Sequence, residues 1–255
     1  MCFDNDSSPP IAPIYGASVS HDDLVLDATD GNRLAAFAAS PDEPGSVGVA
    51  ILPDVRGLYR FYEELALRFA ERGYPTVAID YFGRTAGVRK RVDDFEYMPH
   101  VEQTTQVGIQ GDVAAAVAFL RSPRGGSCSA VFTVGFCFGG RNSWLSAAGG
   151  HGLAGAIGFY GRPGPERDGS PGPLERAGDL QAPILGLMGG DDPGIPVEEV
   201  NAFDEALDAA GVEHEVVIYP GAPHSFFDRK YAEFAAESED AWRRVLAFLE
   251  RHRGE

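Results

Sequence analysis

Cysteines, basic residues and long apolar runs are all scarce in this chain of 255 residues. Its three cysteines, Cys2, Cys128 and Cys137, form neither an even disulfide framework nor a pair with metal-ligand spacing. No run approaches the roughly 18 apolar residues of a membrane-spanning helix. The first residues also lack the basic and then apolar stretch of a secretory signal. We therefore expect a cytoplasmic protein in which the thiols stay reduced.

Basic residues are outnumbered, with 21 Lys and Arg against 38 Asp and Glu, which gives a formal net charge of −17. Such a surface repels nucleic acids and anionic membranes. The sequence contains no G-x-G-x-x-G, no P-loop and no His/Cys metal cluster. We expect no cofactor, no metal and no nucleic-acid or membrane partner. The expected partner is a small-molecule substrate, and the expected state is a monomer or homodimer.

Short apolar runs alternate with helical patterns along most of the chain. Residues 1–20, with three prolines, are expected to form an N-terminal arm, and residues 21–255 one domain. A hairpin is expected over 24–40, turning at Asp30-Gly31. Repeated strand and helix patterns follow, with helices such as 61–73, 197–211 and 238–252. This order predicts an α/β fold: a mainly parallel twisted sheet of about eight strands, helices on both faces, and no large cap domain.

The stretch "VGFCFGG", residues 134–140, places Cys137 at the end of an apolar strand and before a possible helix. Its neighbours are small, as a sharp strand-to-helix turn requires. The pattern G-x-C-x-G-G is similar to the G-x-S-x-G nucleophile elbow, with sulfur in place of oxygen. A buried structural cysteine beside a Gly-rich turn would give the same letters, so the decision rests on the rest of the chain.

An activated thiol needs a base and a carboxylate that orients the base. His224 is the histidine that follows a strand end within a loop, in "IYPGAPHSFF". Asp191 and Asp192 directly follow the apolar run "ILGLMGG", although Asp is also common in plain turns. The order Cys137, Asp192, His224 is the nucleophile, acid, histidine order of the α/β-hydrolases. We predict these three as a triad, with Asp191 as the reserve acid.

On "GFCFGG", "MGGDDPGIP" and "YPGAPHSFF", the chain from about residue 22 resembles the dienelactone hydrolases (carboxymethylenebutenolidases). The resemblance implies an α/β-hydrolase fold and hydrolysis of enol lactones or small esters through a thioester. The family has a carboxylate after its third strand that helps to activate the thiol. Asp54 matches this position, where the family usually has Glu. The backbone N–H groups of Val55 and Phe138 are then the candidate oxyanion-hole donors.

The resemblance also implies substrate-binding arginines. The family's arginine after the fourth strand binds the substrate carboxylate, and Arg84 in "DYFGR" matches it. A second family arginine follows the histidine by four residues. Here that residue is Asp228, with Arg229 one position later, so a preference for carboxylated lactones is expected to be weak.

Three other functions are considered beside this interpretation. Glutamine amidotransferase-like proteins share the cysteine elbow but need a carboxylate two residues after the histidine, where this chain has Phe226. A broad carboxylesterase, including a promiscuous phosphotriesterase, would have the same triad. A non-catalytic ligand-binding protein of this fold would most simply lack one triad member, and none is lacking.

Overall fold

The computed structural model describes residues 7–92, 94–166 and 169–254. The chain forms two compact units, one of residues up to Val131 and one of residues from Phe132 on. Residues 7–18 precede the first strand, which begins within the predicted N-terminal arm of residues 1–20, and the arm itself stays a prediction. Cys2 lies outside the described residues. The expectation of one domain over 21–255 stays a prediction.

The first unit contains four strands in the order β1-β2-β4-β3. The pair β1 and β2 is antiparallel, β2 and β4 are antiparallel, and β3 and β4 are parallel. Its elements are β1 (Val19–Asp27), β2 (Arg33–Pro41), β3 (Val47–Leu52), α1 (Arg60–Ala70), β4 (Thr76–Ile79), α2 (Gly83–Ala86), α3 (Met98–Val101) and α4 (Gln106–Arg121), followed by a 3₁₀ turn (Pro123–Gly125).

The hairpin prediction is confirmed, and the turn uses Gly31 at a φ of +82°. Strand β1 starts earlier than predicted, because Val19 pairs with Pro41 and the strand continues in register from there. The first residues of β1 are mostly polar and exposed, so a search for apolar runs does not include them in the strand. Helix α4 starts after Thr105, which caps it by accepting the N–H of Gly108 at 3.1 Å.

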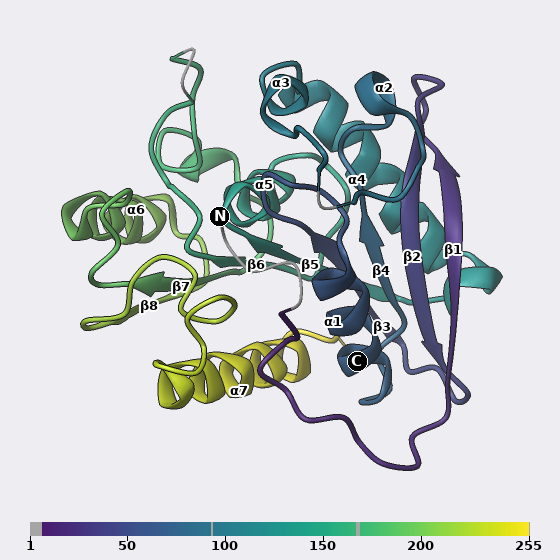
Figure 1. Cartoon of the computed structure of the whole chain (residues 1–255). Coiled ribbons are helices and arrows are strands. Elements are labelled where there is room, and N and C mark those ends of the chain that lie inside the picture. Colours follow the sequence, from purple (N-terminus) through teal and green to yellow (C-terminus); the bar gives the residue numbers. More distant parts are fainter. Residues whose placement is uncertain (1–6, 93, 167–168, 255) are drawn as a thin grey trace. The chain divides into compact units, whose positions relative to one another are not determined.

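The second unit contains four strands in the order β5-β6-β7-β8, all parallel (Figure 1). Helix α5 contacts β6, and α7 contacts β7. Its elements are β5 (Ala130–Phe136), α5 (Phe138–Ser146), β6 (Gly155–Phe159), a 3₁₀ turn (Ala177–Asp179), β7 (Ile184–Gly189), α6 (Val197–Ala210), β8 (His214–Tyr219) and α7 (Ala235–Arg251). The carboxyl ends of parallel neighbours lie at one edge, so the loops that follow these strands meet there.

Helices α6 and α7 each bury one apolar face. Val200, Phe203 and Leu207 are the buried side chains of α6, as their spacing predicts. In α7 the buried face includes Phe248, which packs edge-on against Phe132 of β5. The strand pairings and the alternation of strands and helices agree with the predicted fold class.

Candidate active site

Cys137 sits between β5 and α5 in a strained turn. Its φ of 55° and ψ of −113° are unusual for a residue with a side chain. The close approach of the chain requires glycine nearby, because a Cβ on Gly135 would lie 1.9 Å from the carbonyl oxygen of Gly139. The N–H of Cys137 donates to Phe159 of β6 at 3.0 Å, and its carbonyl accepts the N–H of Gly140. The turn projects a half-buried thiol at the carboxyl end of β5.

His224 is held by Asp192 through a short hydrogen bond. The distance between Nδ1 of His224 and Oδ2 of Asp192 is 2.5 Å. The Asp192 side chain is 2% exposed, and its other oxygen accepts the N–H of Gly194 at 2.8 Å. Asp191, the reserve candidate, is exposed. The geometry thus pairs His224 with Asp192 through Nδ1, and a base that is held in this way would transfer protons through Nε2.

The three predicted triad residues each follow a different strand of one parallel sheet. Cys137 follows β5, Asp192 follows β7 and His224 follows β8. Because parallel strands end at one edge, the structure places all three on the same edge of the second unit. An arrangement of thiol, imidazole and buried carboxylate can perform nucleophilic acyl transfer.

Two residues at this edge are not found by the sequence patterns. Tyr160 follows β6, and its ring centroid lies 4.8 Å from that of His224. Its hydroxyl donates to Oδ2 of Asp228 at 2.5 Å, and both side chains are fully buried. The available signals were the place of Tyr160 directly after a strand and a carboxylate at the position of a family arginine. Neither signal alone suggests a hydrogen bond between the two.

Asp54 and Val55 belong to the first unit, after β3. Asp54 is fully buried, and its Oδ1 accepts the N–H of Arg56 at 2.9 Å. The buried guanidinium of Arg56 lies 3.6 Å from Oδ2, so the carboxylate has a cation beside it. Phe138, the other predicted oxyanion donor, is the first residue of α5 in the second unit. The roles of Asp54, Val55 and Phe138 stay predictions.

Arg84 lies on the short helix α2 and binds two carboxylates of its own unit. Its guanidinium contacts the buried Asp112 at 2.8 Å and Asp30 at 2.8 and 3.1 Å. Burial lowers the pKa of Arg84, but these bonds outweigh that effect and raise the pKa. Burial raises the pKa of Asp112 despite the bond from Arg84. These contacts give Arg84 a structural role, and its predicted role in substrate binding stays a prediction.

Arg229 is exposed in the loop after His224, and its backbone N–H donates to Oδ1 of Asp228 at 2.5 Å. The residue at the position of the family's second arginine is therefore a buried carboxylate. Among the described residues, no group of three or more His, Cys, Asp or Glu side chains is arranged to hold a metal ion. No helix within the described ranges is long and apolar enough to cross a membrane.

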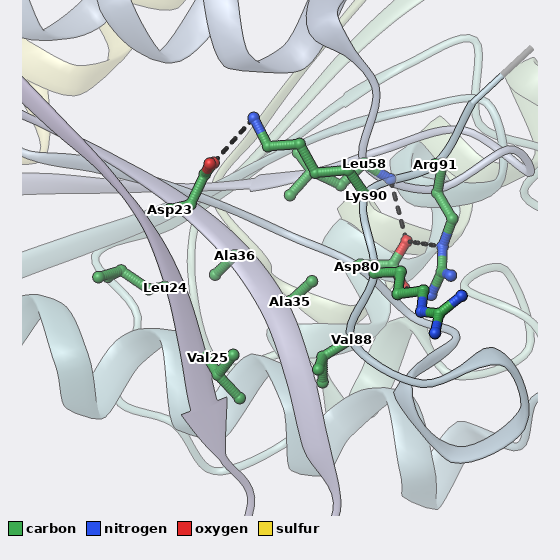
Figure 2. A pocket seen from close by; sticks show the side chains of 11 residues that line it. Asp23, Leu24, Val25, Ala35, Ala36, Leu58, Asp80, Val88, Lys90 and Arg91 are labelled. Carbon is green, nitrogen blue, oxygen red and sulfur yellow. Dashed lines mark hydrogen bonds and ion pairs between the residues drawn. The ribbon is translucent and has the colours of Figure 1, made fainter.

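A cavity of about 250 Å³ lies in the first unit, between the β1–β2 hairpin and residues 88–91 (Figure 2). Among its lining residues, Lys90 pairs with Asp23, and the buried Arg91 pairs with the buried Asp80. It is lined by Asp23, Leu24, Val25, Ala35, Ala36, Leu58, Asp80, Val88, Arg89, Lys90 and Arg91. The sequence-predicted site residues are not in this lining, so the cavity adds nothing to the candidate site.

Comparisons with known proteins agree on one family. The model of the dienelactone hydrolase family matches residues 34–253. An Escherichia coli K12 protein named "Putative carboxymethylenebutenolidase" is 31% identical, over 97% of this chain and 95% of that protein. One from Saccharolobus solfataricus is 28% identical, over 88% and 96%.

Solved structures have the same fold. A "Putative Dienelactone Hydrolase" from Klebsiella pneumoniae is 25% identical, covers 91% of this chain and 99% of its own, and has a TM-score of 0.79. The dienelactone hydrolase-like promiscuous phosphotriesterase P91 from metagenomic libraries is 24% identical, with a TM-score of 0.76 over 93% of this chain and 99% of its own. The fold predicted from the sequence, that of the α/β hydrolases, is confirmed.

Proposed function

Because the chain belongs to the dienelactone hydrolase family, whose model matches residues 34–253, we propose that it hydrolyses lactones or small esters through a thioester on Cys137. The observation that carries the proposal is the 2.5 Å bond between His224 and the buried Asp192. This pair lies at the sheet edge where the strained turn projects the Cys137 thiol.

In the first half of the reaction, Nε2 of His224 takes the proton of the Cys137 thiol. The thiolate attacks the carbonyl carbon and forms a C–S bond, while the carbonyl oxygen takes the negative charge. Collapse of this intermediate breaks the C–O bond of the ester, and the imidazolium returns its proton to the leaving alkoxide. Asp192 keeps the proton of Nδ1 in place and stabilises the imidazolium.

In the second half, His224 takes a proton from water, and the hydroxide attacks the thioester carbon. The C–S bond breaks, the thiolate regains a proton from the imidazolium, and the carboxylic acid leaves. For each negatively charged intermediate, the N–H of Phe138 in the first turn of α5 is a candidate donor. We assign the second donor to Val55 and a role in thiol activation to Asp54, as the family resemblance implies.

A broad carboxylesterase is the second candidate, and one observation favours it. At two positions the resemblance implies an arginine that binds a substrate carboxylate. One of these positions holds the buried Asp228, and at the other Arg84 is already paired with Asp30 and Asp112. A carboxylated lactone would therefore gain little binding energy from these two positions, and a neutral ester does not need them. A phosphotriester is also neutral, and it belongs in the same test. We further propose a cytoplasmic location and a monomer or homodimer.

The test is steady-state hydrolysis of a dienelactone, a neutral aryl ester and a phosphotriester by the wild type, Cys137→Ala and the matched control Cys128→Ala. We expect Cys137→Ala to lower kcat/KM on the order of 10³-fold or more and Cys128→Ala to change it little. Full activity of Cys137→Ala would end the proposal. A wild type inactive on all three substrates would favour a ligand-binding protein.

A further inference from the structure

Asp228 is a fully buried carboxylate four residues after His224. Its Oδ2 accepts the hydroxyl of Tyr160 at 2.5 Å, and its Oδ1 accepts the N–H of Arg229 at 2.5 Å. Both oxygens act as acceptors, which is the pattern of an ionised carboxylate. A buried negative charge is unfavourable unless it is well bonded, and these contacts supply the bonds.

Tyr160 connects this carboxylate to the imidazole of His224. It is fully buried directly after β6, and its backbone is in the left-handed region at a φ of 37°. The N–H of Tyr160 donates to Leu187 of β7, which fixes the turn. Its ring lies 4.8 Å from the His224 ring at an interplanar angle of 55°. His224 is thus held by Asp192 through Nδ1 and packed against an aromatic ring.

The loop that carries His224 closes on itself. Ser225 has a φ of 64°, and its carbonyl accepts the N–H groups of Asp228 and Lys230 at 3.3 and 3.0 Å. Asp228 therefore ends a tight turn that starts beside His224. The hydroxyl of Tyr160 links this turn to the end of β6.

The ring and the carboxylate both favour a cation on His224. An aromatic face within about 6 Å of a cation attracts it, and a phenol whose proton is bonded to an anion carries more electron density in its ring. We propose that Tyr160 and Asp228 form a positioning pair that orients the imidazole of His224 and favours its protonated form. The proposal rests on the proposed role of His224 as the base in the hydrolysis.

Other groups at this edge can also affect His224. Asp192 follows β7 and the Cys137 thiol follows β5. The exposed Asp191 and Arg229 and the half-buried Lys230 lie on neighbouring loop positions. All of these remain when Tyr160 or Asp228 is changed, so such variants isolate the pair. A matched control exists in the same unit, because Tyr219 of β8 donates to Asp240 of α7 at 2.9 Å.

The experiment measures the titration of His224 by NMR in the resting protein and the pH dependence of kcat/KM. The variants are Asp228→Asn, Tyr160→Phe, their double mutant and the control Tyr219→Phe, with His224→Gln to assign the signal. We expect Asp228→Asn to lower the His224 titration point by about half a unit to one unit and kcat/KM roughly 10-fold. Tyr160→Phe, which keeps the ring, should move both in the same direction.

The double mutant should show no more effect than the larger single change, because both changes break the same hydrogen bond. Tyr219→Phe should leave the titration unmoved. An unchanged or raised titration point in both single variants, or additive effects, would overturn the proposal. If Asp228→Asn does not fold, Tyr160→Phe decides alone. If the variants lower the titration point of His224 but the wild type has no hydrolytic activity, the proposed function is rejected and the positioning role of Tyr160 and Asp228 is supported.

Discussion

The residues before and after strands β5 and β8 are of the same kinds but differ in their chemistry. Cys128 lies two positions before β5 and His214 begins β8, whereas Cys137 follows β5 and His224 follows β8. The comparison shows that a cysteine and a histidine at strand ends do not by themselves make a site. The backbone conformation and the carboxylates around them decide it.

The two cysteines differ in burial and in backbone. Cys128 is buried, and its burial raises the pKa of the thiol to about 11. Its Sγ lies 3.7 Å from the carbonyl oxygen of Gly125. Cys137 is half-buried in a left-handed turn that directs its side chain out of the strand. A thiol that stays protonated inside the protein is a poor nucleophile, so Cys128 is the weaker candidate of the two.

The two histidines differ in the carboxylate they contact. His214 contacts Asp204 at 3.2 Å, an aspartate whose side chain is 47% exposed, and its Nδ1 lies 2.7 Å from the Val212 carbonyl. His224 contacts the buried Asp192, which is itself fixed by the N–H of Gly194. A buried, fixed carboxylate holds one tautomer of its histidine. This is the arrangement that a general base requires.

The largest expected effect comes from removing the buried carboxylate. Asp192→Asn should lower kcat on the order of 10³-fold or more, because the amide can favour the wrong tautomer of His224. Asp191→Asn, its exposed neighbour, should change kcat less than about 2-fold. Steady-state kinetics on a neutral aryl ester checks both. Normal turnover in Asp192→Asn would contradict the assignment of the acid.

Alkylation tests the comparison of the two cysteines directly. Iodoacetamide at pH 7.5 should modify Cys137 faster than Cys128 by about 100-fold or more, because a buried thiol with a raised pKa presents little thiolate. Peptide mapping by mass spectrometry over time gives both rates. Loss of activity should follow the Cys137 peptide and be unchanged in Cys128→Ala. Equal rates would remove the distinction between the two ends of β5.

The Arg84→Ala variant tests whether a position near the carboxyl end of a strand is sufficient to make an arginine bind substrate. Because Arg84 binds Asp30 and the buried Asp112, we expect Arg84→Ala to lower the free energy of unfolding by roughly 1–3 kcal/mol. Its effect on KM should be similar for charged and neutral substrates. Urea unfolding and paired kinetics measure this. A KM increase of about 10- to 100-fold for a carboxylated lactone alone would support the substrate-binding role instead.

The effect confined to the narrowest range of conditions is a dependence of stability on pH from Cys128, which is absent at neutral pH. The unfolded thiol loses its proton near pH 9 and the folded thiol near pH 11, so stability falls as the pH rises between these values. Each unit in this range costs up to about 1.4 kcal/mol. Cys128→Ala should flatten the curve of unfolding free energy between pH 9 and 11. A parallel curve in the variant would show that burial does not suppress ionisation of the thiol.

The fold can be predicted from the sequence because buried strands and the glycine-rich turn at Cys137 have strong local patterns. Motif matching favours Asp192 over Asp191 as the acid, and that role stays a prediction; in the structure Asp192 contacts His224 and Asp191 is exposed. Tyr160 and Asp228 are 68 residues apart, and their bond depends on tertiary packing that no local pattern encodes. The resemblance predicts a substrate-binding role for Arg84, and no sequence pattern indicates that Asp30 and Asp112 are its partners.

The central claim is that Cys137 carries the acyl group. The most direct test is rapid quenching of the wild type during turnover of an activated aryl ester, followed by intact-mass and peptide analysis. We predict one acyl adduct on the Cys137 peptide, which appears at the rate of the burst and disappears with hydroxylamine. An adduct on Cys128 or on Ser225, the buried hydroxyl next to His224, would contradict the account. So would full turnover with Cys137 blocked.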